Sequence, residues 1–440
     1  MISALIGRFS SLHDNHKRIA GGAMMVGLLT LVAKSFAAFR ELAIASRFGI
    51  SDVVDSYQLA VTVTTWLPTL LSSTMTVVLV PSLVRRAAGG DRGFLEELNG
   101  TILLLGAAVM LLVWTAAPAI SAILASKADP RTLGMTLTMA RQMAPVSLFL
   151  LLSAYLSARL QARQNFAFSV TEAVPALTIA LAVVLPLGLS GTTPLVGGTL
   201  VGFFFQALVL AALVSKADPP LGTVRIRHRS AGWSPLYGAF LVTIGGQVAL
   251  AFATPVDQAF AARIGPGAVA TLGYANRIVA LFTGAGAVVL ARALLPVFSA
   301  AVATGDPMLG ARQARQWAWL LFMAGGVIAL AGWLAAKPAV ALLFQRGAFG
   351  ASDTAAVAAA LRPALLQMPF YFGGLALVQW IAACGRYRIL LSVACAAIIV
   401  KIAMNLLLVR PLGLTGIMLS TAFMYASSAV LQFWYVRKAS

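Results

Sequence analysis

The chain has 440 residues, of which 60% are hydrophobic and 10% charged, and its mean hydropathy is +0.90. Uncharged runs such as 102–113 and 177–189 occur along the chain, and several apolar windows reach the length of about 20 residues that a helix needs to cross a bilayer. An ordinary soluble protein is therefore excluded. The net charge of +19 does not indicate nucleic-acid binding, since the basic residues lie mainly in short loops and form no compact basic face. The composition therefore predicts a polytopic helical membrane protein.

Apolar segments follow one another along the whole chain. Residues 1–18 carry Arg8, Lys17 and Arg18 and no small-residue cleavage site, so we interpret them as a cytoplasmic N-terminal arm. The spans have no period-two alternation, and helix is therefore the only plausible spanning structure. The twelve predicted spans are 19–40, 53–80, 101–124, 134–158, 167–189, 193–215, 236–262, 268–294, 316–336, 355–383, 389–410 and 413–436.

The distribution of Lys and Arg over the loops predicts the orientation. With the N-terminus inside, eighteen basic loop residues lie on the cytoplasmic side, and seven lie outside. The seven are Arg47, Lys127, Arg131, Arg263, Lys337, Arg346 and Arg410. Both termini are therefore predicted to be cytoplasmic.

A duplicated pattern predicts the domain organisation. Residues 41–49 (ELAIASRFG) return as 257–265 (DQAFAARIG), and 79–91 return as 294–306. A polar, basic stretch at 216–235 separates the copies, so we predict a bundle at 19–215, a cytoplasmic linker at 216–235 and a second bundle at 236–440. Each half has six spans, which predicts parallel repeats around a central cavity, related by an axis along the membrane normal.

Five charged residues lie within or beside the predicted spans at their outer ends: Lys34, Arg40, Asp55, Asp257 and Arg277. A charge at the bilayer centre costs at least ~2.5–3.5 kcal/mol, so such residues should face water or a partner. Three cations with two acids favour an anion-binding cavity where the halves meet. The alternative is ion pairing alone, of Lys34 or Arg40 with Asp55 and of Arg277 with Asp257.

Other intramembrane polar residues give weaker signals. Glu172 in the fifth span is either a proton or cation site or a buried, hydrogen-bonded acid. Lys401 lies deep in the eleventh span, and its interpretation is evenly divided between snorkelling to the headgroups and facing water or a partner. Asn405 fits an interhelical hydrogen bond.

Motifs for soluble enzyme chemistry are absent from the sequence. There is no Gly-Lys dipeptide, hence no phosphate-binding P-loop, and no nucleophile elbow or metalloprotease helix. Cys384 and Cys395 match no zinc or redox spacing. We therefore expect a transporter without catalytic residues, metal or cofactor, driven by a coupling ion, the membrane potential or a partner.

Three motifs carry a resemblance to a known family. Residues 34–49 (KSFAAFRELAIASRFG), followed by Asp55, resemble the first-helix pattern of the MurJ/MviN lipid II flippases in the multidrug/oligosaccharidyl-lipid/polysaccharide exporter superfamily. Residues 274–277 (YANR) with 294–296 (LLP) resemble its YADR…LLP segment, and Arg277 falls on its functional arginine. Residues 343–349 (LFQRGAF) with Asp353 resemble its LFxxGxF…D loop.

The sequence departs from the family pattern at several points. Lys34 stands where the family usually has Arg, and residues 66–69 (WLPT) stand where it has an arginine pair. Twelve spans are predicted here, against the family's typical fourteen. Because of these departures, an exopolysaccharide or O-antigen lipid is a second candidate substrate beside lipid II.

The resemblance implies a flippase of the bacterial inner membrane that moves an undecaprenyl-diphosphate-linked glycan from the inner to the outer leaflet by alternating access. In that picture Lys34, Arg40 and Arg277 hold the diphosphate, and Asp55 and Asp257 orient these cations. Partners would be the lipid-linked glycan, membrane lipid and cell-wall or polysaccharide assembly enzymes. A cation-coupled small-molecule exporter and a non-transporting scaffold remain as alternatives.

Overall fold

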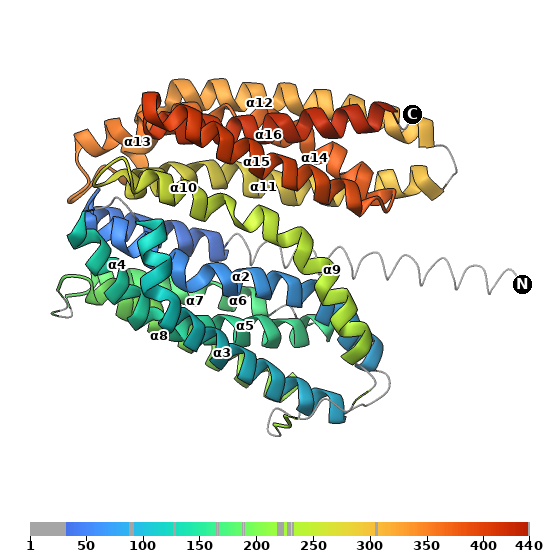
Figure 1. Ribbon diagram of the computed structural model, residues 1–440, viewed down its shortest axis with the longest axis horizontal. Helices are drawn as coiled ribbons and strands as arrows, with labels where there is room; N and C mark the ends of the chain where they lie inside the picture. Colours follow the sequence, from blue (N-terminus) through green and yellow to red (C-terminus); the bar gives the residue numbers. More distant parts are fainter. Residues whose placement is uncertain are drawn as a thin grey trace, which may run out of the picture. The chain divides into compact units, whose positions relative to one another are not determined.

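The computed structural model describes residues 32–438, apart from short gaps at 88–91, 126–128, 164, 166, 187, 189, 218–223, 227–229, 231–232 and 304–306. Every regular element within these residues is an α-helix (Figure 1). A first helix covers 32–48. It is followed by α2 (Asp52–Ala87), α3 (Arg92–Leu124), α4 (Pro130–Met143), α5 (Pro145–Ala162), α6 (Phe168–Thr171), α7 (Ala173–Val184), α8 (Thr193–Ala217), α9 (Trp233–Ala251), α10 (Ala253–Ala261), α11 (Ala268–Ala303), α12 (Pro307–Phe344), α13 (Ala351–Leu365), α14 (Met368–Ala383), α15 (Tyr387–Leu412) and α16 (Leu414–Lys438).

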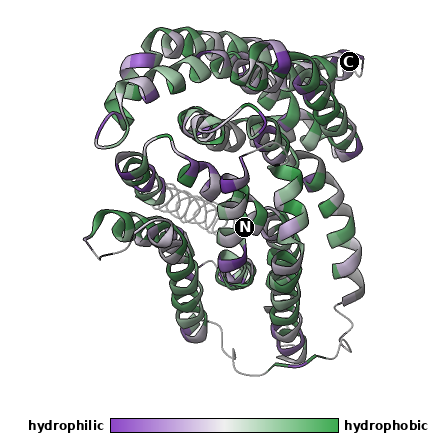
Figure 2. Ribbon diagram, turned by 60° about the vertical axis from the view of Figure 1, so that its left-hand side comes forward, coloured by the Kyte–Doolittle hydropathy of each residue, from purple (hydrophilic) through white to green (hydrophobic). Residues whose placement is uncertain are grey.

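The surface of these helices is that of a membrane protein. Seven described helices are long and apolar enough to cross a membrane, and α13 with α14, bent by 41° at their break, makes an eighth. Large apolar side chains stay exposed, such as Leu342 at 76% and Leu334 at 72%, and hydrophobic residues run along most helices in Figure 2. Such a large exposed apolar surface is unfavourable in water and favourable in the hydrocarbon core of a bilayer. The predicted all-α integral membrane fold is confirmed.

Each of the twelve predicted spans contains a helix or a broken pair of helices in the described part of the chain. The broken pairs are α4–α5, α6–α7, α9–α10 and α13–α14. Residues 19–31 of the first predicted span lie outside the described residues. The structure extends α12 to Pro307–Phe344, well beyond the predicted 316–336, because the helix continues through a polar flank at its start and past Lys337 and Pro338 at its end.

The chain forms two compact units, and the first consists of Met1–Ala43, Leu67–Val113 and Gln142–Phe240. Within it α7 and α8 approach closely at two glycines of α8. A Cβ on Gly198 would lie 2.8 Å from the Cα of Ile179, and one on Gly202 would lie 2.6 Å from the Cα of Pro175. The absence of a side chain is therefore what permits this helix contact, as is common between membrane helices.

The described part of the predicted linker 216–235 is held against the start of α3 in the same unit. Arg225 Nε binds Glu96 Oε2 at 2.8 Å. Glu97 Oε2 accepts hydrogen bonds from the backbone N–H of Ser230 at 3.2 Å and from the indole of Trp233 at 2.7 Å. These bonds satisfy a glutamate that is only 6% exposed.

The second compact unit consists of Ile44–Trp66, Trp114–Arg141 and Leu241–Ser440. It takes in α10 to α16 together with the first half of α2 and most of α4. Helices α12 and α14 approach closely, since a Cβ on Gly325 would lie 2.6 Å from the carbonyl oxygen of Met368. The units thus do not follow chain order, and the predicted boundary at 216–235 between two six-helix halves stays a prediction.

Candidate functional site

The three motifs that carry the family resemblance meet in the second unit. The N–H of Ala348 donates to the carbonyl of Ser46 at 2.7 Å. The hydroxyl of Tyr274 donates to the carbonyl of Gly49 at 3.2 Å. The Tyr274 ring also packs against Phe349, with centroids 5.4 Å apart. The RFG turn, the YANR helix and the LFQRGAF loop therefore form one structural junction.

Two glycines make this junction possible. Gly49 and Gly347 have φ values of +55° and +61°, a region that residues with a side chain rarely adopt. A Cβ on Gly347 would clash with the carbonyl oxygen of Ser46, and one on Gly49 would lie 2.6 Å from the carbonyl oxygen of Ala348. The two chain segments can cross only where both positions are glycine.

Asp55 caps the N-terminus of α11. Its two carboxylate oxygens accept the backbone N–H groups of Gly267 and Ala270, each at 2.6 Å, and the residue is 2% exposed. A carboxylate is favourable there because the first N–H groups of a helix lack intrahelical partners and carry partial positive charge. The structure thus gives Asp55 a backbone partner rather than Lys34 or Arg40.

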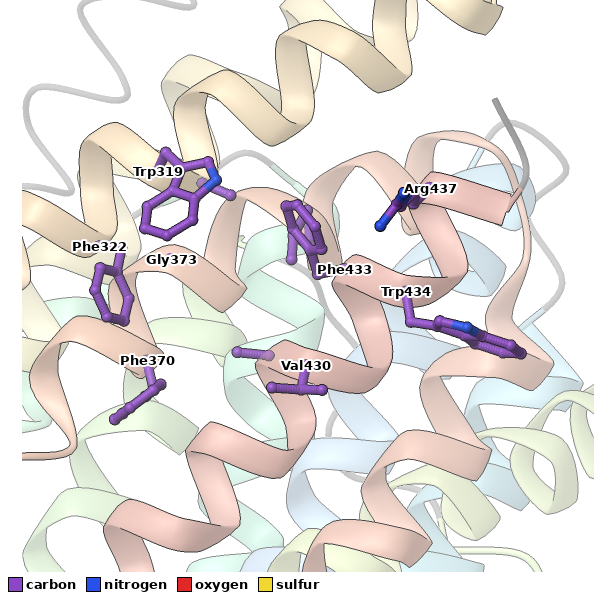
Figure 3. A pocket seen from close by; sticks show the side chains of 11 residues that line it. Trp319, Phe322, Phe370, Gly373, Val430, Phe433, Trp434 and Arg437 are labelled. Carbon is purple, nitrogen blue, oxygen red and sulfur yellow. The ribbon is translucent and has the colours of Figure 1, made fainter.

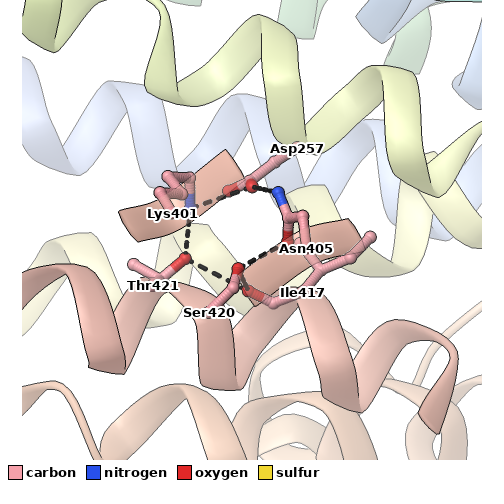
Figure 4. Close-up of polar contacts among 6 residues, drawn as sticks. All are labelled: Asp257, Lys401, Asn405, Ile417, Ser420 and Thr421. Atoms are coloured by element: carbon pink, nitrogen blue, oxygen red, sulfur yellow. Dashed lines mark hydrogen bonds and ion pairs between the residues drawn. The ribbon is translucent and has the colours of Figure 1, made fainter. Parts of the chain in front are cut away.

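Asp257 belongs to a buried polar network that joins α10, α15 and α16 (Figure 4). Lys401 Nζ lies 2.9 Å from Asp257 Oδ1 and donates to Thr421 Oγ1 at 2.6 Å. Asn405 Nδ2 donates to the same Asp257 oxygen at 3.2 Å, and Ser420 Oγ donates to Asn405 Oδ1 at 2.5 Å. The carboxylate thus binds Lys401, and the pairing with Arg277, which was the alternative to an anion site, does not occur in this network.

Sequence reasoning identified only part of this network. Lys401 and Asn405 were noticed as intramembrane polar residues, and Asn405 does make the interhelical bond expected of it. The structure decides the interpretation of Lys401, which is fully buried at 0% exposed and paired. The spacing of four residues between Lys401 and Asn405 could have predicted that both side chains lie on one face of α15. Nothing in the sequence indicated that Ser420 and Thr421 belong to the network.

Arg277 lies on α11, between two and three turns beyond the end capped by Asp55. Its guanidinium lies 5.7 Å from the centre of the Tyr274 ring, within the range of a cation–π interaction. The residue is half-buried. The family's arginine position is thus joined through Tyr274 to the motif junction.

Lys34, Arg40 and Glu172 lie in the first unit. Arg40 is on the helix 32–48, and its Nε donates to Glu41 Oε1 at 3.0 Å. Lys34 is exposed and close enough to Glu172 for their charges to attract. Glu172 occupies the break between α6 and α7 and is exposed on the protein surface. The charges of Lys34 and Glu172 therefore attract each other, an interaction that the sequence did not predict.

The described residues contain no group of three or more His, Cys, Asp or Glu that could hold a metal ion. The described residues do include long basic side chains in an otherwise apolar protein, and Arg40, Arg277 and Lys401 each have an acidic or aromatic neighbour. Such groups bind anions, phosphates above all, and provide no nucleophile with a base.

The fold is shared with solved membrane transporters. The chain is similar to a structure described as "Lipid II flippase MurJ, inward closed conformation", with a TM-score of 0.82 and 18% identity over 94% of this chain and 87% of that one. It is also similar to an inward-facing multidrug resistance MATE family transporter of the MOP superfamily, with a TM-score of 0.73 and 15% identity over 95% and 98% of the two chains. These likenesses define the fold, which is the multi-helix membrane fold that the two solved proteins share.

The sequence narrows this to one family. The family model described as "Lipid II flippase MurJ" matches residues 44–440, so the chain belongs to the MurJ family, and the resemblance seen in its motifs is confirmed. A "Probable lipid II flippase MurJ" from Synechocystis sp. is 27% identical over 96% of this chain and 82% of its own length. Another from Bdellovibrio bacteriovorus is 24% identical over 98% and 84%. The family consists of transporters and not enzymes, as the sequence predicted.

Proposed function

We propose that this protein flips lipid II, an undecaprenyl-diphosphate-linked glycan, from the inner to the outer leaflet of the bacterial inner membrane by alternating access. The observation that supports this most is the family match, which covers 44–440 and includes the described intramembrane charges from Asp55 onward. Two similar proteins carry the same proposed activity in their names. The MATE-like fold supports a transport cycle.

Lys34, Arg40 and Arg277 bind the diphosphate in this proposal. A diphosphate presents several anionic oxygens, and Arg can bind two of them at once, whereas Lys contributes a single charged centre. Arg277 is half-buried on α11, and Lys34 is exposed on helix 32–48. Each therefore keeps side-chain surface that an anion can reach.

The acids have a supporting role in the proposal. Asp55 fixes the N-terminus of α11, the helix that carries Arg277. Asp257 neutralises Lys401 inside the second unit. Both therefore act on the geometry and charge around the substrate-binding cations without contacting the substrate. Glu172, next to Lys34, is the acid we propose for coupling to a proton or cation.

The departures at Lys34 and at 66–69 favour one second candidate, an exopolysaccharide or O-antigen lipid. It shares the polyprenyl diphosphate with lipid II and differs in the sugar. The cations described above would serve either substrate, so the headgroup must be identified directly.

Conditional depletion of the protein tests the proposal. If the substrate is lipid II, depletion causes lipid II to accumulate at the inner leaflet, cells lyse, and the wild-type chain restores growth. Mass spectrometry of the extracted polyprenyl lipids identifies the accumulating species. Accumulation of a different lipid-linked glycan, with peptidoglycan synthesis unchanged, would replace lipid II by the second candidate. No accumulating lipid at all would contradict both.

A further inference from the structure

An apolar groove runs along α12, α14 and α16 in the second unit, and its lining includes none of the residues proposed to bind the substrate and none of the family motifs (Figure 3). Its volume is about 390 Å³, within the ~300–1,000 Å³ typical of ligand sites. Five aromatic side chains line it: Trp319, Phe322, Phe370, Phe433 and Trp434. The groove is thus large enough for a ligand and has almost no polar lining except at one end.

Small residues form the floor of the groove. Gly373 and Ala318 lie where α14 meets α12, and a Cβ on Gly373 would be 3.1 Å from the carbonyl oxygen of Ala318. The walls are rigid aromatic rings, with Phe322 5.6 Å from Trp319 and 5.4 Å from Phe370 between centroids. These rings pack edge to face and give the groove an apolar aromatic lining, which favours contact with a hydrocarbon chain.

Charge at one end of the groove indicates an anionic headgroup. Arg437 lines the groove in the last turn of α16, next to Lys438. On α12, Arg315 and Arg312 precede Trp319 by about one and two turns on the same helix face. Asp353 is the only acid after residue 306, so this part of the chain has a positive charge that an anion would complement.

We propose that this groove binds an anionic phospholipid, with an acyl chain between Trp319 and Trp434 and the headgroup phosphate at Arg437. The aromatic residues at the basic end match the preference of Trp for the membrane–water interface. The site is separate from the residues proposed to bind the transported substrate, and the inference does not depend on what that substrate is.

Tryptophan quenching tests the proposal. The full-length protein is reconstituted into vesicles containing phosphatidylglycerol or phosphatidylcholine with brominated acyl chains, at equal bromine content. We expect stronger quenching by brominated phosphatidylglycerol. Because the chain has 8 tryptophans, Trp319→Phe and Trp434→Phe identify the groove's share of the signal, which should fall in both variants.

Two further variants separate chain from headgroup recognition. Ala429→Phe fills the groove and should reduce quenching by both lipids, whereas Ala335→Phe, at an exposed position of α12 outside the groove, should not. Arg437→Gln should lower the preference for phosphatidylglycerol about fivefold. Arg410→Gln, an exposed charge on α15, should leave it unchanged.

Equal quenching by the two lipids in wild type and Arg437→Gln would overturn the proposal, because the face would then be ordinary lipid-exposed surface. Quenching that is insensitive to Trp319→Phe and Trp434→Phe would overturn it as well. Normal thermal unfolding of each variant, recorded on the same samples, shows that the loss belongs to the groove and not to misfolding.

Discussion

The carboxylate of Asp257 accepts hydrogen bonds from two donors, the ammonium of Lys401 and the amide of Asn405. Taking such charges out of water is costly, and the attraction between them offsets the cost only when the remaining hydrogen bonds are also made. Thr421 and Ser420 supply these bonds. The network therefore depends on all of its members, and losing one leaves a buried group uncompensated.

Removing the lysine should reveal this dependence. Lys401→Met leaves Asp257 as an unpaired buried charge, and we expect the free energy of unfolding to fall by about 3–5 kcal/mol. The Asp257→Asn, Lys401→Met double variant removes both charges and should lose clearly less than Lys401→Met alone. Denaturation in detergent micelles measures both, with Arg410→Gln as the exposed control on α15. Additive losses in the double variant would show that the two charges do not interact.

Substitutions at the cations test the proposed transport site. Arg40→Ala and Arg277→Ala should each abolish flipping at normal membrane abundance, because charge-assisted hydrogen bonds worth about 1.5–3 kcal/mol each are lost. Arg277→Lys should keep partial function, since it retains the charge and loses the two-pronged geometry. At Lys34 we expect the opposite effect of exchanging Lys and Arg: Lys34→Arg should be tolerated, because the family pattern usually has Arg at this position. Complementation of a depleted strain measures all four, and full activity of the Arg40→Ala, Arg277→Ala double variant would reject the anion-binding role.

At the scale of elements, the second unit is held together where α2, α11 and the loop after α12 meet. Asp55 on α2 caps α11, and Ser46 before α2 binds Ala348 after α12. These contacts join segments more than 200 residues apart in sequence, so the turn 46–50 fixes the direction of helices from the other half of the chain.

Loss of the cap should destabilise α11. Asp55→Ala removes two hydrogen bonds to backbone N–H groups and a favourable charge at a helix N-terminus, for which we expect a loss of about 2 kcal/mol, the upper end for a cap. Asp52→Ala, in the first turn of α2, should cost about 0.5 kcal/mol. Thermal unfolding compares them. Equal effects would mean that the acids act only through their charge and that the hydrogen bonds to α11 add nothing.

The glycines of the junction offer a matched pair. Gly347 and Gly413 have nearly the same φ, +61° and +57°, but a Cβ at Gly347 would clash with Ser46, whereas one at Gly413 has nothing within 4 Å. Gly413 has φ +57° and ψ −132°, a backbone conformation that residues with a side chain rarely adopt, so Gly413→Ala should cost only the backbone strain of about 1–3 kcal/mol. Gly347→Ala should cost clearly more and reduce the membrane level of the protein. Similar losses in the two variants would contradict a steric role for Gly347.

For the whole molecule, hydropathy and motif order were enough to predict an all-helical membrane transporter and its family. Hydropathy identifies the spans because a helix in lipid must have an apolar surface and must satisfy its backbone hydrogen bonds internally. Hydropathy and motif order did not predict the partners of Asp55 and Asp257, since backbone N–H groups and the side chains of α15 and α16 form those sites only after folding. Lys401 illustrates the limit, because a buried, paired lysine and a snorkelling one have the same sequence signature.

The orientation of the chain is the prediction on which the proposed direction of transport depends. Eighteen basic loop residues against seven predict that 216–235 and both termini are cytoplasmic. Fusions of alkaline phosphatase, active only outside, and of a fluorescent protein, active only inside, should report an internal position after residue 235 and after residue 440. A fusion within 126–128, between α3 and α4, should report the outside and serves as the control. An external linker would reverse the orientation, and with it the leaflet from which the proposed substrate enters.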